Sequence, residues 1–207
     1  MQQRIGILGG TFDPPHHAHL ILAQHAYEEL KLAKVLFVPA GVPPHKDYTR
    51  TPVEHRLAML ELAMDDIPYF ELSRVEIDRP GPHYTIETMK IIRQQNAESE
   101  LFFIMGGDVF RDLPNWERPQ ELFATAHLAV AVMRRPGRDG YALRPDMHED
   151  VIPGLAQHTM ILNSPLVEFS STDIVERLMA GKSVRWMVSE PVLAYIAEHG
   201  LYKPSEE

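Results

Sequence analysis

The chain has 207 residues, enough to bury one sizeable core, so we expect a single domain spanning residues 1–207. Its formal net charge of −9 argues against a general nucleic-acid binder, because such proteins present a basic surface. No apolar run has the length of a membrane span, and the absence of cysteine excludes disulfides and thiolate metal sites. We therefore expect a cytoplasmic protein that contacts neither nucleic acid nor membrane.

The predicted elements alternate between strand and helix along the chain. Short apolar runs predict buried strands at residues 5–8, 35–38, 101–105 and 128–133. The apolar stripe Leu20, Ala23, Tyr27 and Leu30 predicts a first helix. A second helix is predicted to follow the capping box Thr51-Pro52-Val53-Glu54, which has proline at the first helical position. A third is predicted from Thr85 through Ile92. This order predicts an α/β fold: a Rossmann-like, doubly wound parallel sheet over residues 1–165.

A small helical part is predicted at the C-terminus, over residues 166–207. Ser170, Ser171 and Thr172 precede a helical pattern, where they would either cap the helix or form a cradle for an anion. The string Ser189-Glu190-Pro191 predicts the start of the last helix, and Gly200 its end.

The most informative segment follows the first predicted strand and reads Gly9-Gly10-Thr11-Phe12-Asp13-Pro14-Pro15-His16-His17-Ala18-His19. His16 and His19 are three residues apart at the start of a helix, so both rings can face one ligand. Glycines allow close approach of the backbone, and a helix N-terminus favours phosphate. The alternative is an ordinary strand-to-helix turn with packed or solvated histidines. We interpret the segment as a nucleotide phosphate site.

Polar or glycine-rich strings follow the other three predicted strands as well. They are residues 40–46, the string Gly106-Gly107-Asp108, and Arg134-Arg135-Pro136-Gly137. The carboxyl ends of parallel strands meet at one edge of a sheet, where doubly wound folds bind ligands. The sequence therefore predicts one binding site built from four strand ends.

The 9–19 segment resembles the signature of the nucleotidyltransferase superfamily. Across nearly its full length the chain resembles the bacterial nicotinate-nucleotide adenylyltransferases. The further strings that carry this resemblance are Val42-Pro43-Pro44-His45-Lys46, Tyr84-Thr85-Ile86-Glu87-Thr88, Gly106-Gly107-Asp108 with Leu113-Pro114-Asn115-Trp116, Arg134-Arg135-Pro136-Gly137, Phe169-Ser170-Ser171-Thr172, and Tyr195-Ile196-Ala197-Glu198-His199-Gly200-Leu201-Tyr202.

The resemblance implies that ATP and nicotinate mononucleotide react to nicotinate adenine dinucleotide and pyrophosphate, a step of NAD biosynthesis, with Mg²⁺ accompanying ATP and no separate protein metal site. It assigns catalysis to His16, His19 and Lys46. It assigns ATP binding to Gly9, Gly10, Thr11, Phe12, His16, His19, Gly106, Asp108, Arg135, Ser170, Ser171 and Thr172. It assigns mononucleotide binding to Thr11, His45, Lys46, Tyr84, Thr85 and Trp116.

Three of these assignments have physical reasons, and two of the three have alternatives. Trp116 would stack on the pyridine ring, or else be a core residue. Tyr84 and Thr85 begin a predicted helix, whose N–H groups suit the nicotinate carboxylate and would favour the acid over the amide. Asp108 suits a ribose hydroxyl or a metal contact, or else caps a helix.

The chain departs from the family pattern at Ala18, where glycine is usual, and at Val175, where an arginine usually contacts the triphosphate. Arg177 is badly placed to replace that arginine, which leaves Arg134, Lys182 or Arg185. The alternative functions are a related adenylyltransferase for nicotinamide mononucleotide or phosphopantetheine, and a non-catalytic nucleotide sensor. Homo-oligomer formation stays open.

Overall fold

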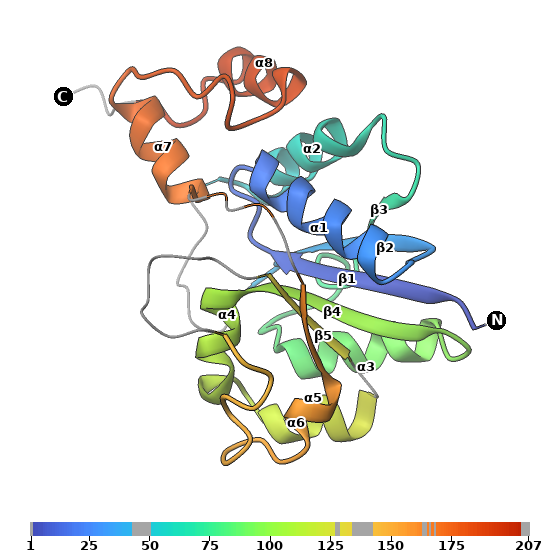
Figure 1. Cartoon of the computed structure of the whole chain (residues 1–207). Coiled ribbons are helices and arrows are strands. Elements are labelled where there is room, and N and C mark those ends of the chain that lie inside the picture. Colours follow the sequence, from blue (N-terminus) through green and yellow to red (C-terminus); the bar gives the residue numbers. More distant parts are fainter. Residues whose placement is uncertain are drawn as a thin grey trace.

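The computed structural model describes residues 2–42, 51–126, 129–133, 143–162, 165, 167 and 169–203. Its centre is a parallel sheet with the strand order β3-β2-β1-β4-β5-β6, which is the order of dinucleotide-binding Rossmann folds (Figure 1). The strands are β1 Arg4–Gly10, β2 Lys34–Pro39, β3 Phe70–Leu72, β4 Glu100–Gly106, β5 Ala129–Met133 and β6 Thr159–Leu162. The predicted α/β class and the four predicted strands are confirmed. The sequence missed β3 and β6, which are short and lie at the two edges of the sheet.

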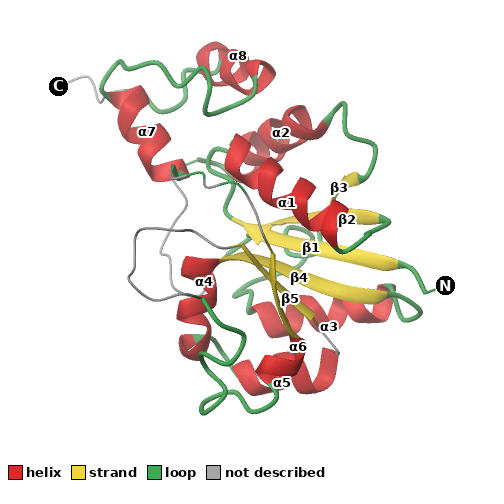
Figure 2. Ribbon diagram, viewed as in Figure 1, coloured by secondary structure: helices red, strands yellow, loops and turns green. Residues whose placement is uncertain are grey.

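Helices cover both faces of the sheet. They are α1 His17–Glu29, α2 Val53–Met64, α3 Thr85–Gln95, α4 Gly107–Asp112, α5 Pro119–Ala126, α6 Leu155–His158, α7 Ser171–Met179 and α8 Glu190–Glu198, with a 3-10 turn at Leu113–Asn115. In Figure 2, α1 and α2 lie on one face, α3 and α5 lie on the other, and α8 lies beyond α2. In the described part of the chain, every helix is too short or too polar to cross a lipid bilayer.

The core has two layers because successive strand residues point to opposite faces of the sheet. In β4, Phe103 packs in one buried cluster with Met89 of α3. Its neighbours Phe102 and Ile104 pack in a second cluster with Ala26 of α1. A third cluster joins the C-terminal helices to the outer side of α2 and contains Met59, Ile174, Val188, Val192 and Ile196. The C-terminal helices are therefore attached to the helices that cover β1, beside the carboxyl end of that strand.

The helix boundaries correct two predictions. The capping box at Thr51 is wrong, because α2 begins at Val53 and Pro52 occupies its cap position without a side-chain hydrogen bond. Thr51 is buried instead, and its N–H donates to Asp13 Oδ2 at 3.2 Å. Ser189 does precede α8, but its hydroxyl makes no capping hydrogen bond. Gly200 follows the last turn of α8 with a φ of +60°, which confirms the predicted glycine stop.

Candidate active site

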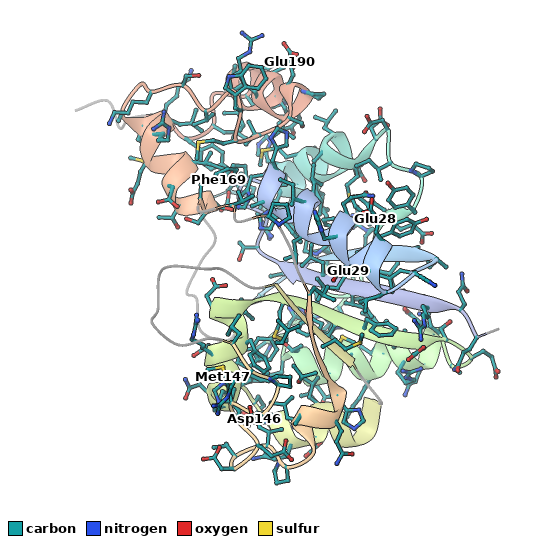
Figure 3. All side chains as sticks on the ribbon, in the orientation of Figure 1. Glu28, Glu29, Asp146, Met147, Phe169 and Glu190 are labelled. Carbon is teal, nitrogen blue, oxygen red and sulfur yellow. The ribbon has the colours of Figure 1, made fainter. Side chains whose placement is uncertain are left out.

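A cleft of about 790 Å³ lies at the carboxyl ends of β1 and β4, the two strands between which the strand order reverses. Its walls come from the loop after β1, the starts of α1 and α3, the Gly106–Asp108 turn, and the residues that lead into α7, among them Phe169, which is labelled in Figure 3. This volume lies within the range of small-molecule sites. For the strands β1 and β4, the structure confirms the predicted convergence of polar loops on one site.

His16 and His19 form a stacked pair at the start of α1. Their ring centroids are 3.7 Å apart with an interplanar angle of 22°. His16 is the N-cap residue and is 5% exposed, and its backbone N–H donates to His19 Nδ1 at 3.2 Å. Because Nδ1 of His19 accepts this hydrogen bond, the ring proton of the neutral imidazole is on Nε2, where it can be donated. The predicted common direction of the two rings is confirmed.

The backbone at the start of α1 is less available to an anion than the sequence suggested. The N–H of His17 donates to the carbonyl of Met187 at 2.9 Å, and the N–H of His19 donates to the carbonyl of His16 at 2.9 Å. Two of the first three N–H groups of the helix are therefore engaged within the protein. A phosphate in this part of the cleft would depend on the imidazole rings and on the glycine turn more than on the helix N-terminus.

The glycine turn after β1 is tightly packed. A Cβ on Gly10 would lie 3.0 Å from the Phe12 ring, while Gly9 has more room. Phe12 is 1% exposed and packs edge-on against His19, with ring centroids 4.9 Å apart. Because the Phe12 side chain is buried, its predicted contact with ATP would run through the backbone.

Side chains from distant segments hold this turn in place. Arg56 of α2 donates to the Thr11 carbonyl at 2.8 Å, and the Ser171 hydroxyl of α7 donates to the Pro14 carbonyl at 2.9 Å. The Tyr202 hydroxyl donates to Asp13 Oδ1 at 2.6 Å. Sequence reasoning missed the roles of Arg56 and Tyr202, although Tyr202 ends one of the strings that carry the family resemblance.

The opposite wall of the cleft is built at the start of α3. Tyr84 is the extended N-cap residue of α3, and its carbonyl accepts the first helical hydrogen bonds from the N–H groups of Glu87 and Thr88. The N–H groups of Thr85 and Ile86 precede these bonds, and both residues line the cleft. Trp116 also lines the cleft and packs edge-on against Phe103, with ring centroids 5.9 Å apart. It is thus partly a core residue and partly cleft wall.

A buried histidine on this wall was missed. His83 is 5% exposed; its Nδ1 accepts the N–H of Val42 at 2.8 Å, and its Nε2 lies 3.1 Å from the Arg79 carbonyl. Glu76 Oε2 accepts the neighbouring N–H of Gly41 at 3.2 Å. A Cβ on Gly41 would lie 2.6 Å from His83 Cε1, so a larger residue would push the two segments apart. A single histidine without a spaced partner gave no signal in the sequence.

Helix capping is one of two interpretations for the hydroxyls at 170–172 and also for Asp108, and the structure tests it in both cases. Ser170 caps α7: its Oγ accepts the N–H of Asp173, and the Asp173 carboxylate accepts the N–H of Ser170 at 2.7 Å. Ser170, Ser171 and Thr172 all line the cleft. Helix capping by Asp108 is wrong, because α4 begins at Gly107 with Gly106 as its cap; Asp108 is exposed and lines the cleft.

The two departures from the family pattern both lie in the cleft wall. Ala18 and Val175 line the cleft, and Val175 is 2% exposed. Arg177 donates to the Ser183 carbonyl at 2.9 Å, so it does not replace the expected arginine. Lys182 and Arg185 are exposed, and neither is among the described residues that line the cleft.

The described part of the cleft wall contains no lysine or arginine, whereas Asp13, Glu76, Asp108 and Glu117 contribute carboxylates. The basic residues predicted for the site, Lys46, Arg134 and Arg135, lie outside the described residues, as does His45. Within the described residues, no three histidine, aspartate or glutamate side chains gather to hold a metal ion.

Comparisons with known proteins add to this geometry. The model of the cytidylyltransferase-like family matches residues 7–177. A probable nicotinate-nucleotide adenylyltransferase of Thermomicrobium roseum is 42% identical over 98% of this chain and 93% of its own length. One from Dehalococcoides mccartyi is 43% identical over 96% of this chain and 97% of its own. The fold is similar to that of a nicotinic acid mononucleotide adenylyltransferase of Plasmodium falciparum complexed with NaAD, with a TM-score of 0.79 at 18% identity, covering 97% of this chain and 98% of that one.

Proposed function

Because the chain belongs to the nicotinate-nucleotide adenylyltransferase family, within the cytidylyltransferase-like proteins, we propose that it transfers the adenylyl group of ATP to nicotinate mononucleotide. The products are nicotinate adenine dinucleotide and pyrophosphate, in a step of NAD biosynthesis. The observation that carries the proposal is the stacked His16–His19 pair facing the start of α3 across one cleft at the reversal of the strand order.

The reaction needs alignment more than it needs a strong base. A phosphate oxygen of the mononucleotide, already anionic at neutral pH, forms a bond to the α-phosphorus of ATP while the bond to the bridging oxygen of pyrophosphate breaks. Catalysis then depends on holding the two phosphates in line and on stabilising the charge that develops on the α- and β-phosphate oxygens. His16 and His19 are positioned to donate hydrogen bonds to these oxygens, and Lys46 is proposed to join them.

The two walls of the cleft divide the substrates between them. We assign ATP to the wall formed by Gly9, Gly10, Thr11 and Phe12, together with Gly106, Asp108 and the hydroxyls that begin α7. We assign the mononucleotide to the wall at the start of α3, where Trp116 offers a ring face and the N–H groups of Thr85 and Ile86 suit a carboxylate. Arg135 and His45 complete the two sets, as proposed from the family resemblance.

Mg²⁺ is proposed to enter with ATP. Mg²⁺ commonly binds through one or two carboxylates together with substrate phosphates and water. Asp108 fits this role, because its exposed carboxylate lies in the cleft wall beside the Gly106 turn. When bound, the ion would neutralise charge on the triphosphate. The described cleft wall contributes carboxylates and no lysine or arginine, which supports a role for a cation beside the triphosphate.

The experiment that tests the function supplies the purified protein with ATP, Mg²⁺ and one acceptor at a time, and measures pyrophosphate release. Nicotinate mononucleotide is expected to give the highest kcat/KM, because a neutral amide cannot use the N–H groups at the start of α3 as a carboxylate does. Equal use of nicotinamide mononucleotide would contradict the carboxylate site. Faster use of phosphopantetheine would assign a different acceptor, and release with no acceptor would contradict the family activity. Cytoplasmic location and homo-oligomer formation stay predictions.

A further inference from the structure

The carboxylate of Asp13 joins three segments that are far apart in the sequence. It is 8% exposed, and its Oδ1 accepts the Tyr202 hydroxyl at 2.6 Å while its Oδ2 accepts the N–H of Thr51 at 3.2 Å. Thr51 comes directly after residues 43–50, which contain His45 and Lys46. One buried carboxylate is therefore bonded to Tyr202 through one oxygen and to Thr51 through the other.

Arg56 supplies the charge that makes a buried carboxylate tolerable here. Its side chain is 1% exposed, and it donates to the Thr11 carbonyl at 2.8 Å, two residues before Asp13. Burial lowers the pKa of the Arg56 guanidinium, and the Asp13 charge opposes that shift. An ion of each sign inside the protein is stable only when hydrogen bonds and an opposite charge compensate the loss of water.

The phenol of Tyr202 is held in its neutral, donating form. Burial raises its pKa above the ordinary value, and the hydrogen bond to Asp13 adds to that shift. The hydroxyl therefore stays protonated and donates to Asp13 at neutral pH. This contact lies three residues before His16, so it acts on the turn that presents the histidine pair.

We propose that Tyr202 is a positioning residue for adenylyl transfer: through Asp13, its hydroxyl fixes the turn that carries His16 and His19. The proposal rests on the proposed function. Tyr202 is not among the residues that line the described part of the cleft, so its effect reaches the substrates through the groups that its hydroxyl holds, chiefly Asp13 of the turn. The mononucleotide wall at Tyr84, Thr85 and Trp116 is built on other elements. Loss of the hydroxyl is therefore expected to lower kcat and to leave KM for the mononucleotide nearly unchanged.

The test compares Tyr202→Phe with a matched control, Tyr195→Phe. Tyr195 lies in the same C-terminal segment, is also half-buried, and its hydroxyl lies 2.9 Å from His55 Nδ1, which is not among the residues that line the cleft. Tyr202→Phe loses the hydrogen bonds of its hydroxyl with Asp13 and Thr51, and Tyr195→Phe loses the contact with His55. A purely structural role predicts lower stability in each variant and no selective fall in kcat for Tyr202→Phe. For Tyr202→Phe we expect kcat to fall about three- to tenfold, as for the loss of one positioning hydrogen bond. KM for nicotinate mononucleotide should stay within about twofold of wild type.

A second readout does not depend on turnover. The ring ¹⁵N resonances of His16 and His19, identified through His16→Ala and His19→Ala, report the hydrogen bond at His19 Nδ1. They should shift in Tyr202→Phe and stay at their wild-type positions in Tyr195→Phe. If wild type releases no pyrophosphate, the proposed function fails, while these resonances still decide the positioning role. If Tyr202→Phe matches Tyr195→Phe in kcat and in the ring resonances, the proposal is overturned.

Discussion

Replacing His83 tests whether the wall beside the mononucleotide is held by a single buried side chain. His83→Ala removes the acceptor for the Val42 N–H and the donor to the Arg79 carbonyl. Leaving two partly buried polar groups unpaired costs about 1 kcal/mol for each group, at the low end of the known range. Losing the packed ring adds about 1 kcal/mol more. The free energy of unfolding should fall by about 3 kcal/mol, which lowers Tm by about 6–12 °C in a chain of this size.

His83→Asn is the sharper variant, because its side-chain oxygen can occupy the place of Nδ1 and still accept the Val42 N–H. We expect it to lose about half as much stability as His83→Ala. Val42 leads into the 43–50 segment, which carries the predicted His45 and Lys46, so KM for nicotinate mononucleotide should rise in His83→Ala and less in His83→Asn.

The assays are calorimetric unfolding and steady-state pyrophosphate release. His148→Ala is the control: its ring lies 3.1 Å from the Phe110 carbonyl, and it is not among the residues that line the described cleft. The free energy of unfolding of His148→Ala should fall, while its KM for the mononucleotide stays unchanged. Equal KM increases in His83→Ala and His83→Asn would refute the role of the Val42 contact.

Three further predictions concern other positions. His19→Ala should lower kcat by about 10²–10³ in a protein with near wild-type Tm, because it removes a preorganised donor; turnover within a few-fold of wild type would remove His19 from the catalytic residues. Val175→Arg should lower KM for ATP by supplying the cation that the family usually has there, and steady-state kinetics showing no change would indicate that another basic residue already serves. The raised pKa of Tyr202 means that its contribution to stability is complete below about pH 10 and is lost as pH rises further. Unfolding measured between pH 8 and 11 should therefore show a steeper alkaline loss in wild type than in Tyr202→Phe; parallel curves would contradict this linkage.

The sequence predicted those parts of the structure that local patterns determine. The apolar runs of β1, β2 and β4 are nearly continuous because both faces of a central parallel strand are buried. The spacing of His16 and His19 predicted their common direction because both lie within one turn of the same helix start.

The rest depends on contacts that no local pattern records. The edge strand β3 has three residues, too few for a periodic signal. Arg56 occupies a helical position where an exposed, solvated arginine is the ordinary expectation, and only the fold shows that it is buried against Thr11. His83 likewise has no motif around it that would mark it, because its ring contacts backbone groups, the N–H of Val42, 41 residues away, and the carbonyl of Arg79.

The hydrogen bonds that hold the turn after β1 also affect the order in which parts of this protein can fold. Asp13 and Tyr202 are 189 residues apart in the chain, and Ser171 and Pro14 are 157 apart. Contacts of such long range form only after most of the loop-closure entropy has been lost, so they come late in folding. On the ribosome, Asp13 emerges long before Tyr202 has been synthesised. The nascent chain can thus assemble its central strands early, while the turn after β1 waits for Tyr202 to emerge, and a ligand that needs this turn cannot stabilise the protein by binding before then.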